Sequence, residues 1–232
     1  MSFLSDAIVS AVNLIVNLDR DLIEIISLSL KITLSATLFA SVAGIILGSA
    51  IALYDFPGRN ILTLLINTFM GFPPVVLGLF VYLLLSRSGP LGILGLLYTP
   101  TAMVIAQTLL ILPIIIALTR QTIFEINKEY NEQLRSLGAE KFQIMKTLVW
   151  ESRLTITTII LAGYGRANAE VGAVMIVGGN INHATRVMTT TIAHETGKGN
   201  LILALSLGII LILIAFLINF TMQKIESISE QE

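Results

Sequence analysis

The sequence predicts an all-α integral membrane protein with about five transmembrane helices. Of its 232 residues, 55% are hydrophobic and only 12% are charged, which is too apolar for a soluble domain. The apolar residues gather in runs as long as the ~20 residues that a helix needs to cross a bilayer. Between two of these runs lies a long polar stretch, Arg120 to Arg153, which we call the polar island.

The expected spans are residues 22–54, 61–85, 101–119, 154–177 and 201–222. Before them, residues 1–20 mix apolar side chains with Asp6, Asn13 and Asn17, a pattern that predicts a short interfacial helix. The alternative is a frayed tail. Residues 21–232 are expected to form a single transmembrane domain, with the polar island at about 120–153 as its main loop.

The first span carries a stripe of small residues. Ala40, Gly44, Gly48 and Ala52 repeat every four positions, so they share one helix face on which another helix can approach closely.

The second span contains the sequence Gly71-Phe-Pro-Pro74. Proline cannot donate a backbone hydrogen bond, so Pro73 and Pro74 predict a kink whose freed carbonyls point into the protein or toward water. Farther along, residues 178–200 are rich in threonine and too long for a bare turn, and we expect part of this loop to re-enter the protein.

The polar island reads as two helices joined by a glycine bend. Tyr130, Leu134 and Leu137 fall at i, i+4 and i+7 on one face of the first helix, for which Asn127 is the expected N-cap and Gly138 the expected stop.

Phe142, Met145 and Leu148 follow at three-residue steps and predict the second helix. The island has six basic and five acidic residues, so its charges nearly cancel and a polybasic lipid patch is not expected. An amphipathic helix pair of this kind can offer an apolar face to a groove on another protein. The alternative is a solvated connector between spans.

Basic residues give an orientation. One set of loops carries Arg59, the six basic residues of the island and Lys224, against four basic residues in the opposite set. The positive-inside rule then places the island in the cytoplasm, the N-terminus outside and the C-terminus in the cytoplasm of a multi-pass plasma-membrane protein.

Two charges fall inside the fourth expected span. Arg166 and Glu170 are spaced i, i+4 and should share a helix face. Each would cost about 2.5–3.5 kcal/mol unpaired at a helix centre, so they are expected to face the protein interior. They could border a substrate path, or form a buried pair that fixes helix packing.

Several kinds of chemistry are not expected. Gly197-Lys198 lacks the flanking residues of a Walker A loop, so ATP hydrolysis by this chain is not predicted. His183 and His194 have no third ligand near them in sequence, which makes a metal site improbable. The net charge of −1 argues against nucleic-acid binding. No catalytic residues are assigned.

The island resembles the EAA loop of ABC importer permeases, E-A-A-x3-G-x9-I-x-L-P. Glu132, Gly138 and Leu148 stand at the matching positions, whereas Gln133 and Leu134 replace the two alanines and Trp150-Glu151 the final Leu-Pro. The resemblance implies a type I permease fold whose coupling helices dock on a partner ATPase subunit. The coupling residues it implies are Glu132, Leu134, Leu137, Gly138, Ala139, Phe142 and Met145.

Farther along, GRANAEVGAVMIVGGNI at residues 165–181 is similar to the R-A-x-x-E-x-G-A...G-N-I run of molybdate, tungstate and sulfate permeases. With TRVMTTTIAHETGKG at 185–199, the chain looks most like the tungstate-type permease. Hydroxyl and amide groups could replace part of an oxyanion's hydration without trapping it. The candidate path residues are Arg166, Asn168, Glu170, Asn180, Asn182, Thr189 and Thr190. For any one of the threonines, plain packing with a satisfied hydroxyl is the alternative.

The resemblance implies an ATP-driven importer of tungstate or a related oxyanion. Its expected partners are ABC ATPase subunits that bind the ATP, an extracytoplasmic oxyanion-binding protein, a second copy of the chain and the lipid bilayer. This chain itself is expected to bind no cofactor. Alternatives are a permease specific for molybdate or sulfate, an ion-coupled secondary transporter for an anion, and a scaffold that transports nothing.

Overall fold

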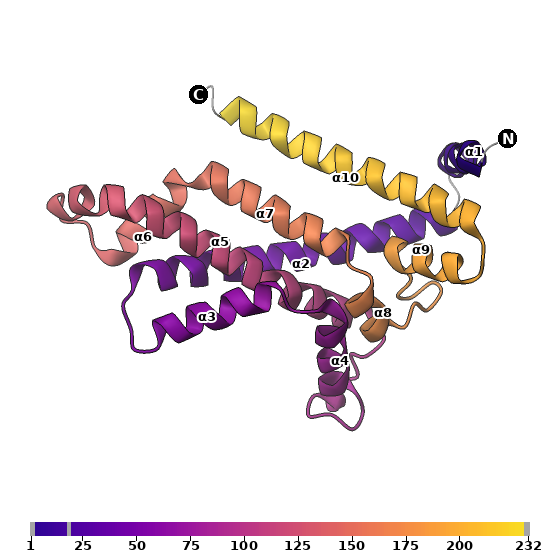
Figure 1. Ribbon diagram of the computed structural model, residues 1–232, viewed down its shortest axis with the longest axis horizontal. Coiled ribbons are helices and arrows are strands. Elements are labelled where there is room, and N and C mark those ends of the chain that lie inside the picture. Colours follow the sequence, from indigo (N-terminus) through magenta and orange to yellow (C-terminus); the bar gives the residue numbers. More distant parts are fainter. Residues whose placement is uncertain (1–2, 18–19, 230–232) are drawn as a thin grey trace. The chain divides into compact units, whose positions relative to one another are not determined.

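A computed structural model describes residues 3–17 and 20–229 of the chain (Figure 1). These residues form ten α-helices and one short 3-10 helix and contain no strand, which confirms the predicted all-α class. In chain order the elements are α1 (Phe3–Val16), α2 (Arg20–Leu53), α3 (Arg59–Met70), α4 (Pro74–Leu85), η1 (Gly92–Leu94), α5 (Pro100–Ser136), α6 (Lys141–Glu151), α7 (Arg153–Asn168), α8 (Gly172–Gly178), α9 (Met188–Gly197) and α10 (Leu201–Ser229).

Three of the described helices are long and apolar enough to cross a membrane. They are α2, α5 and the part of α10 up to Thr221, and α3 with α4 make a fourth if they count as one broken span. Pro74 is the first residue of α4, a position where the missing N–H of proline leaves no helical hydrogen bond unmade.

The fourth expected span, 154–177, is wrong as one continuous helix. α7 has 16 residues and ends at Asn168, and α8 begins at Gly172 and has 7. Between them the buried carboxylate of Glu170 accepts a hydrogen bond from the backbone N–H of Ala173 at 2.8 Å. Glu170 thus supports a new helix start, because the first N–H groups of a helix have no intrahelical partner.

The described residues divide into two compact units. The first unit draws on Met1–Ser35, Pro74–Gln107 and Asn168–Glu232, and the second on Ala36–Pro73 and Thr108–Ala167.

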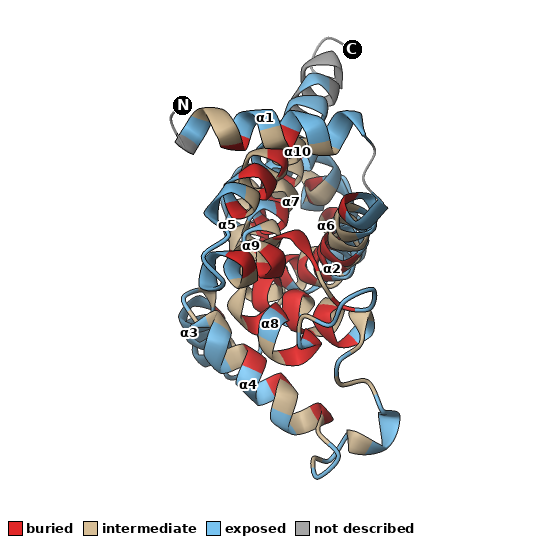
Figure 2. Cartoon of the chain, turned by 90° about the vertical axis from the view of Figure 1, so that its right-hand side faces the viewer, coloured by how far each residue is buried: buried red, intermediate tan, exposed pale blue. Residues whose placement is uncertain are grey.

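In the first unit, α8 is buried against α4. A Cβ atom added to Gly78 of α4 would lie 2.6 Å from the Cα of Ala173 in α8, so only glycine allows this approach. Val81, Val174 and Val177 join Met103 of α5 in the same core. Figure 2 shows α8 and α9 with much of their length buried.

The predicted N-terminal helix exists and packs within the first unit. Ala7 and Ala11 of α1 are buried, and Ser206 of α10 donates a hydrogen bond to the carbonyl oxygen of Ala7 at 2.9 Å. Ile8, Val9 and other large apolar residues of α1 stay exposed, as the interfacial interpretation requires.

In the second unit, α2 and α5 meet along the predicted stripe of small residues. A Cβ atom on Gly44 would lie 2.6 Å from a methyl carbon of Ile115, and one on Gly48 would lie 2.7 Å from the backbone oxygen of Ile116. Ala40 is fully buried in the same interface. The stripe therefore brings the two backbones into close contact.

Helix α5 has 37 residues and continues well into the polar island. The expected helix start at Asn127 is therefore wrong: Asn127 lies inside α5, and its side-chain oxygen makes no hydrogen bond among the described residues. One turn before Asn127, Ile123 of α5 packs with Ile144 and Leu148 of α6, and Tyr130 and Leu134 beyond Asn127 join the same core. This core holds the end of α5 helical.

We predict that Gly48→Ala destabilises the protein by about 1–3 kcal/mol, because the added methyl group would press on the backbone of α5. Gly208→Ala is the matched control, since a Cβ atom at Gly208 meets nothing within 4 Å. The measurement is the thermal midpoint of each purified variant in detergent. An equal midpoint for both variants would contradict the close α2–α5 contact.

Candidate functional site

The bend of the polar island is built around Gly138. Its φ of +79° lies in the left-handed region, which glycine adopts without strain. The N–H of Gly138 bonds to the carbonyl of Arg135, and the N–H of Ala139 bonds to the carbonyl of Leu134. These two bonds form a Schellman motif, so α5 stops at the predicted glycine.

Helix α6 begins three residues after Gly138, at Lys141. The side chain of Gln143 accepts a hydrogen bond from the backbone N–H of Glu140 at 2.8 Å, which satisfies a group that would otherwise face solvent at the helix start. Ile144 and Leu148 are buried, so they fix the face that α6 turns toward the second unit.

The expected coupling residues lie on both sides of this bend. Leu134 and Ala139 pack against the apolar core of the second unit, and Met145 is half-buried. In contrast, Glu132 is exposed, Leu137 is 82% exposed and Phe142 is 65% exposed.

The expectation that Leu137 shares the face of Tyr130 and Leu134 is wrong. Tyr130 and Leu134 pack in the core, whereas Leu137 follows the last helical residue and projects away from it. Leu137 and Phe142 therefore present two large and mostly exposed apolar side chains next to a charged surface. Such exposed apolar residues are typical of a site that another protein covers.

Arg166 and Glu170 do not lie on one helix face, because α7 ends at Asn168. Arg166 is half-buried near the end of α7, and Glu170 is buried in the segment before α8.

The threonines of α9 are held by specific hydrogen bonds. Thr189 donates to the backbone oxygen of Glu170 at 2.9 Å, and Thr190 lies 2.9 Å from the side-chain oxygen of Asn180. Thr190 is fully buried and also bonds to the backbone of Val187. Asn180, with φ +49°, thus joins the turn after α8 to the start of α9.

A small cavity with polar and apolar lining adjoins two of the candidate path residues. Its volume is about 10 Å³, and Asn168 and Thr189 line it together with Ser29, Thr33 and Gln107. Ser29 in turn accepts a hydrogen bond from the N–H of Met188. The sequence analysis did not single out Ser29, Thr33 or Gln107. A signal for this helix face was present, because Thr33, Thr37 and Ser41 recur at four-residue steps in an apolar helix, and all three are buried.

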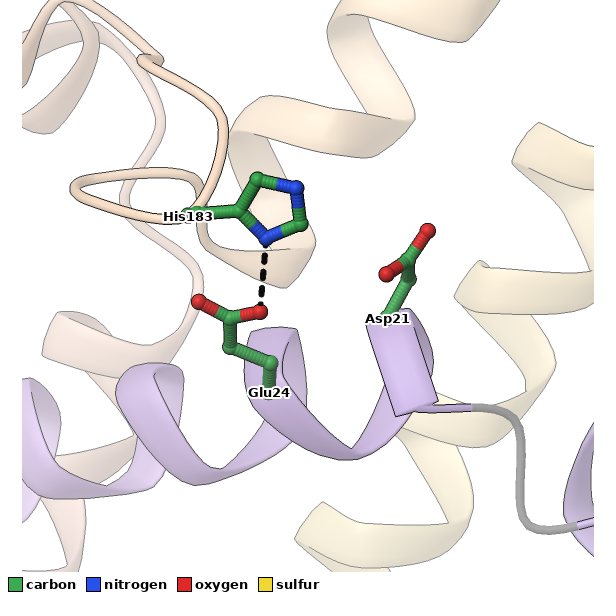
Figure 3. Close-up of side chains that lie close together, drawn as sticks. All are labelled: Asp21, Glu24 and His183. Carbon is green, nitrogen blue, oxygen red and sulfur yellow. Dashed lines mark hydrogen bonds and ion pairs between the residues drawn. The ribbon is translucent and has the colours of Figure 1, made fainter.

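The last candidate, Asn182, is exposed and lies beside a polar cluster at the start of α2. Figure 3 shows His183 next to Glu24 and Asp21 at the start of α2, with His183 Nδ1 2.8 Å from Glu24 Oε2. The sequence spacing missed this cluster because 159 positions separate Glu24 from His183. The three side chains could approach one metal ion, but all are exposed and Arg186 lies in the same pocket.

The hydrogen bond from Glu24 raises the pKa of His183 above its usual value, and the charges of Glu24 and Asp21 add to this effect. Burial and the charge of Arg186 act in the opposite direction, but they are smaller than the hydrogen bond. The pair is therefore strongest when His183 is protonated.

Comparison with known proteins identifies the class. A family model described as the inner membrane component of binding-protein-dependent transport systems matches residues 40–227. The chain belongs to this family.

Three relatives share most of their length with this permease-type chain. A probable anion ABC transporter permease protein of Haloferax volcanii is 39% identical over 85% of the chain and 88% of its own length. The tungstate uptake system permease proteins TupB of Peptoclostridium acidaminophilum and Campylobacter jejuni are 36% and 35% identical. Each covers 97% of the chain, and the alignments take in 99% and 95% of the two relatives.

The family membership makes this chain a multi-pass membrane protein with a role in transport. A membrane component of a binding-protein-dependent system works with partner proteins.

We predict that the His183–Glu24 pair stabilises the permease at low pH only. Because the folded-state pKa of His183 is raised, the stabilisation is fully present below its unfolded value of about 6.5 and is lost as the pH rises through the raised value. A double-mutant cycle with His183→Gln and Glu24→Gln should give a favourable coupling of thermal midpoints at pH 5.5 and none at pH 8.5. A coupling of equal size at both pH values would disprove this account.

Proposed function

We propose that this chain is the membrane-spanning permease subunit of an ATP-driven ABC importer that carries tungstate or a related oxyanion. The similarity to two tungstate uptake permeases over 97% of the chain carries this proposal. The relative from Haloferax volcanii, described as an anion permease, supports the same class of substrate.

ATP would be bound and hydrolysed by partner ATPase subunits, because the chain has no Walker A loop in its sequence. The surface around Gly138 is the proposed contact with that partner. Leu137 and Phe142 would enter an apolar groove on the ATPase, and Glu132 would lie at the polar rim. The Schellman turn and the core beneath it keep these side chains at fixed positions.

The proposed assembly contains two copies of this chain, two ATPase subunits and an extracytoplasmic oxyanion-binding protein. The distribution of basic residues supports a cytoplasmic polar island, an external N-terminus and a cytoplasmic C-terminus. We propose no enzymatic activity for the chain itself, no cofactor bound to it, and no role for nucleic acid.

The candidate path residues would meet the anion as weak ligands. Asn168 and Thr189 line the same small cavity, which at about 10 Å³ is too small for an oxyanion. It would have to open before their amide and hydroxyl groups could replace water around the anion. Thr190 and Asn180 already bond to each other, so their first contribution is to hold the turn after α8. Arg166, Glu170 and Asn182 remain candidates for the same path.

The experiment that tests the proposal is ATP hydrolysis by the complex that co-purifies with this chain, reconstituted in liposomes. A candidate binding protein is added empty, and then loaded with tungstate, molybdate or sulfate. We expect the tungstate form to stimulate hydrolysis severalfold over the empty form. Failure of any ATPase to co-purify, or equal rates with all forms, would contradict the importer role.

The coupling surface makes a separate prediction. Leu137→Ala combined with Phe142→Ala should reduce stimulated ATP hydrolysis and transport at least tenfold, because each truncated anchor at a protein interface costs about 1–2 kcal/mol or more. Ile93→Ala is the control, because Ile93 is 96% exposed but lies in the loop before α5, outside the polar island. Membrane insertion should be normal in all variants. Wild-type coupling in the double variant would exclude this surface.

A further inference from the structure

The second unit contains a groove of about 660 Å³ between α2, α6 and α7. Its volume lies within the roughly 300–1,000 Å³ typical of sites for small molecules. Ile45, Ile46 and Ser49 of α2 form one wall, and Met145 and Val149 of α6 face it. Phe142, which also belongs to the proposed ATPase contact, lines the groove as well. We call this the α6 groove.

The lining is mostly apolar, with the hydroxyl residues Ser49 and Thr157 and two cations. Lys146 of α6 and Arg153 of α7 are both exposed, and no acidic residue lines the groove. Lys146 and Trp150 are spaced i, i+4 on α6, which places the ammonium group and the indole ring on the same helix face. The guanidinium of Arg153 lies over the ring of Trp150, 5.5 Å from its centre.

The groove reaches from the polar island into the apolar part of the chain. Residues 45–49 belong to α2, a helix apolar enough to span the membrane, and they lie on the order of 10 Å from its end at ~1.5 Å per residue. Trp150 is 69% exposed, and tryptophan side chains concentrate at the boundary between acyl chains and headgroups. The exposed Trp150 therefore favours a position of the two cations at headgroup level, next to the apolar residues of α2.

We propose that the α6 groove binds one anionic phospholipid. Its phosphate would lie between Lys146 and Arg153, and one acyl chain would lie against Ile45, Ile46 and Val149. The charge of the lining favours this occupant, because an uncharged occupant would leave the two cations without counter-charges. Basic pockets beside membrane helices also bind anionic headgroups. The proposal depends on membrane insertion of α2 but not on which anion is transported.

Trp150 provides the test, because it is the only tryptophan in the chain. The full chain is reconstituted in phosphatidylcholine vesicles that contain a rising fraction of brominated lipid, which quenches tryptophan fluorescence on contact. Brominated phosphatidylglycerol and brominated phosphatidylcholine are compared at equal fractions. Each cation near the surface contributes about fivefold, so two predict a preference of about 25-fold for phosphatidylglycerol.

Variants separate the site from general attraction to the island. Lys146→Gln with Arg153→Gln should reduce the preference to near one, and Lys146→Arg with Arg153→Lys should retain it. The matched control is Arg135→Gln with Lys141→Gln, which removes two cations of the island that do not line the groove. This control should keep the preference of the wild-type chain.

Three results would overturn the proposal. The first is equal quenching by the two brominated lipids, and the second is an equal loss of preference in the Arg135/Lys141 control. The third is an absence of quenching by either lipid, which would show that protein, such as a second copy of the chain, covers the groove. A failure of tungstate-stimulated ATP hydrolysis would leave this measurement unaffected, so the two proposals fail independently.

Discussion

The close approach of α2 and α5 is the contact on which the second unit depends. Lipid tails are as apolar as leucine side chains, so burial of apolar surface contributes little to the free energy of association of membrane helices. Dispersion contacts must replace that force, and they need backbones that lie near each other. Gly44 and Gly48 allow this against Ile115 and Ile116, and the buried Ala40 continues the contact. The polar island rests on the far end of these two helices, where Ala52 and Ile123 pack with α6.

The first unit meets a different requirement, because its backbone leaves the helical path around α8. Non-helical backbone at membrane depth persists only where its polar groups find partners. Glu170 supplies one partner to Ala173, and Thr185 bonds to the carbonyl of Gly178 and accepts from Ile181. The polar residues that make this segment a candidate anion path therefore also hold it together. Mutational loss of transport here needs a parallel measurement of folding before it is assigned to the path.

Sequence reasoning was strongest where the pattern is local. Composition gave the all-α membrane class, the four-residue repeat from Ala40 to Ala52 predicted a helix contact, and Gly138 marked a helix end. It failed where residues far apart in the sequence determine the local structure. Asn127 has the chemistry of an N-cap, but the core around Ile123 and Ile144 keeps α5 continuous past it. The spacing of Glu170 from Arg166 suits a helix interior, yet helix α7 ends before Glu170. No periodicity in the sequence predicts the contact between His183 and Glu24.

The continuity of α5 gives the polar island a mechanical property. At ~1.5 Å per residue its 37 residues form a rod about 55 Å long, and α6 is attached at one end through a turn of only four residues. A tilt of about 5° about the middle of such a rod moves each end by roughly 2 Å. The hydrogen-bond ladder is interrupted at Pro113, which is where the rod would bend most easily. Any force applied to the turn at Gly138 is thus carried along the second unit's part of α5 as far as Pro113, which lies within the apolar part of this helix.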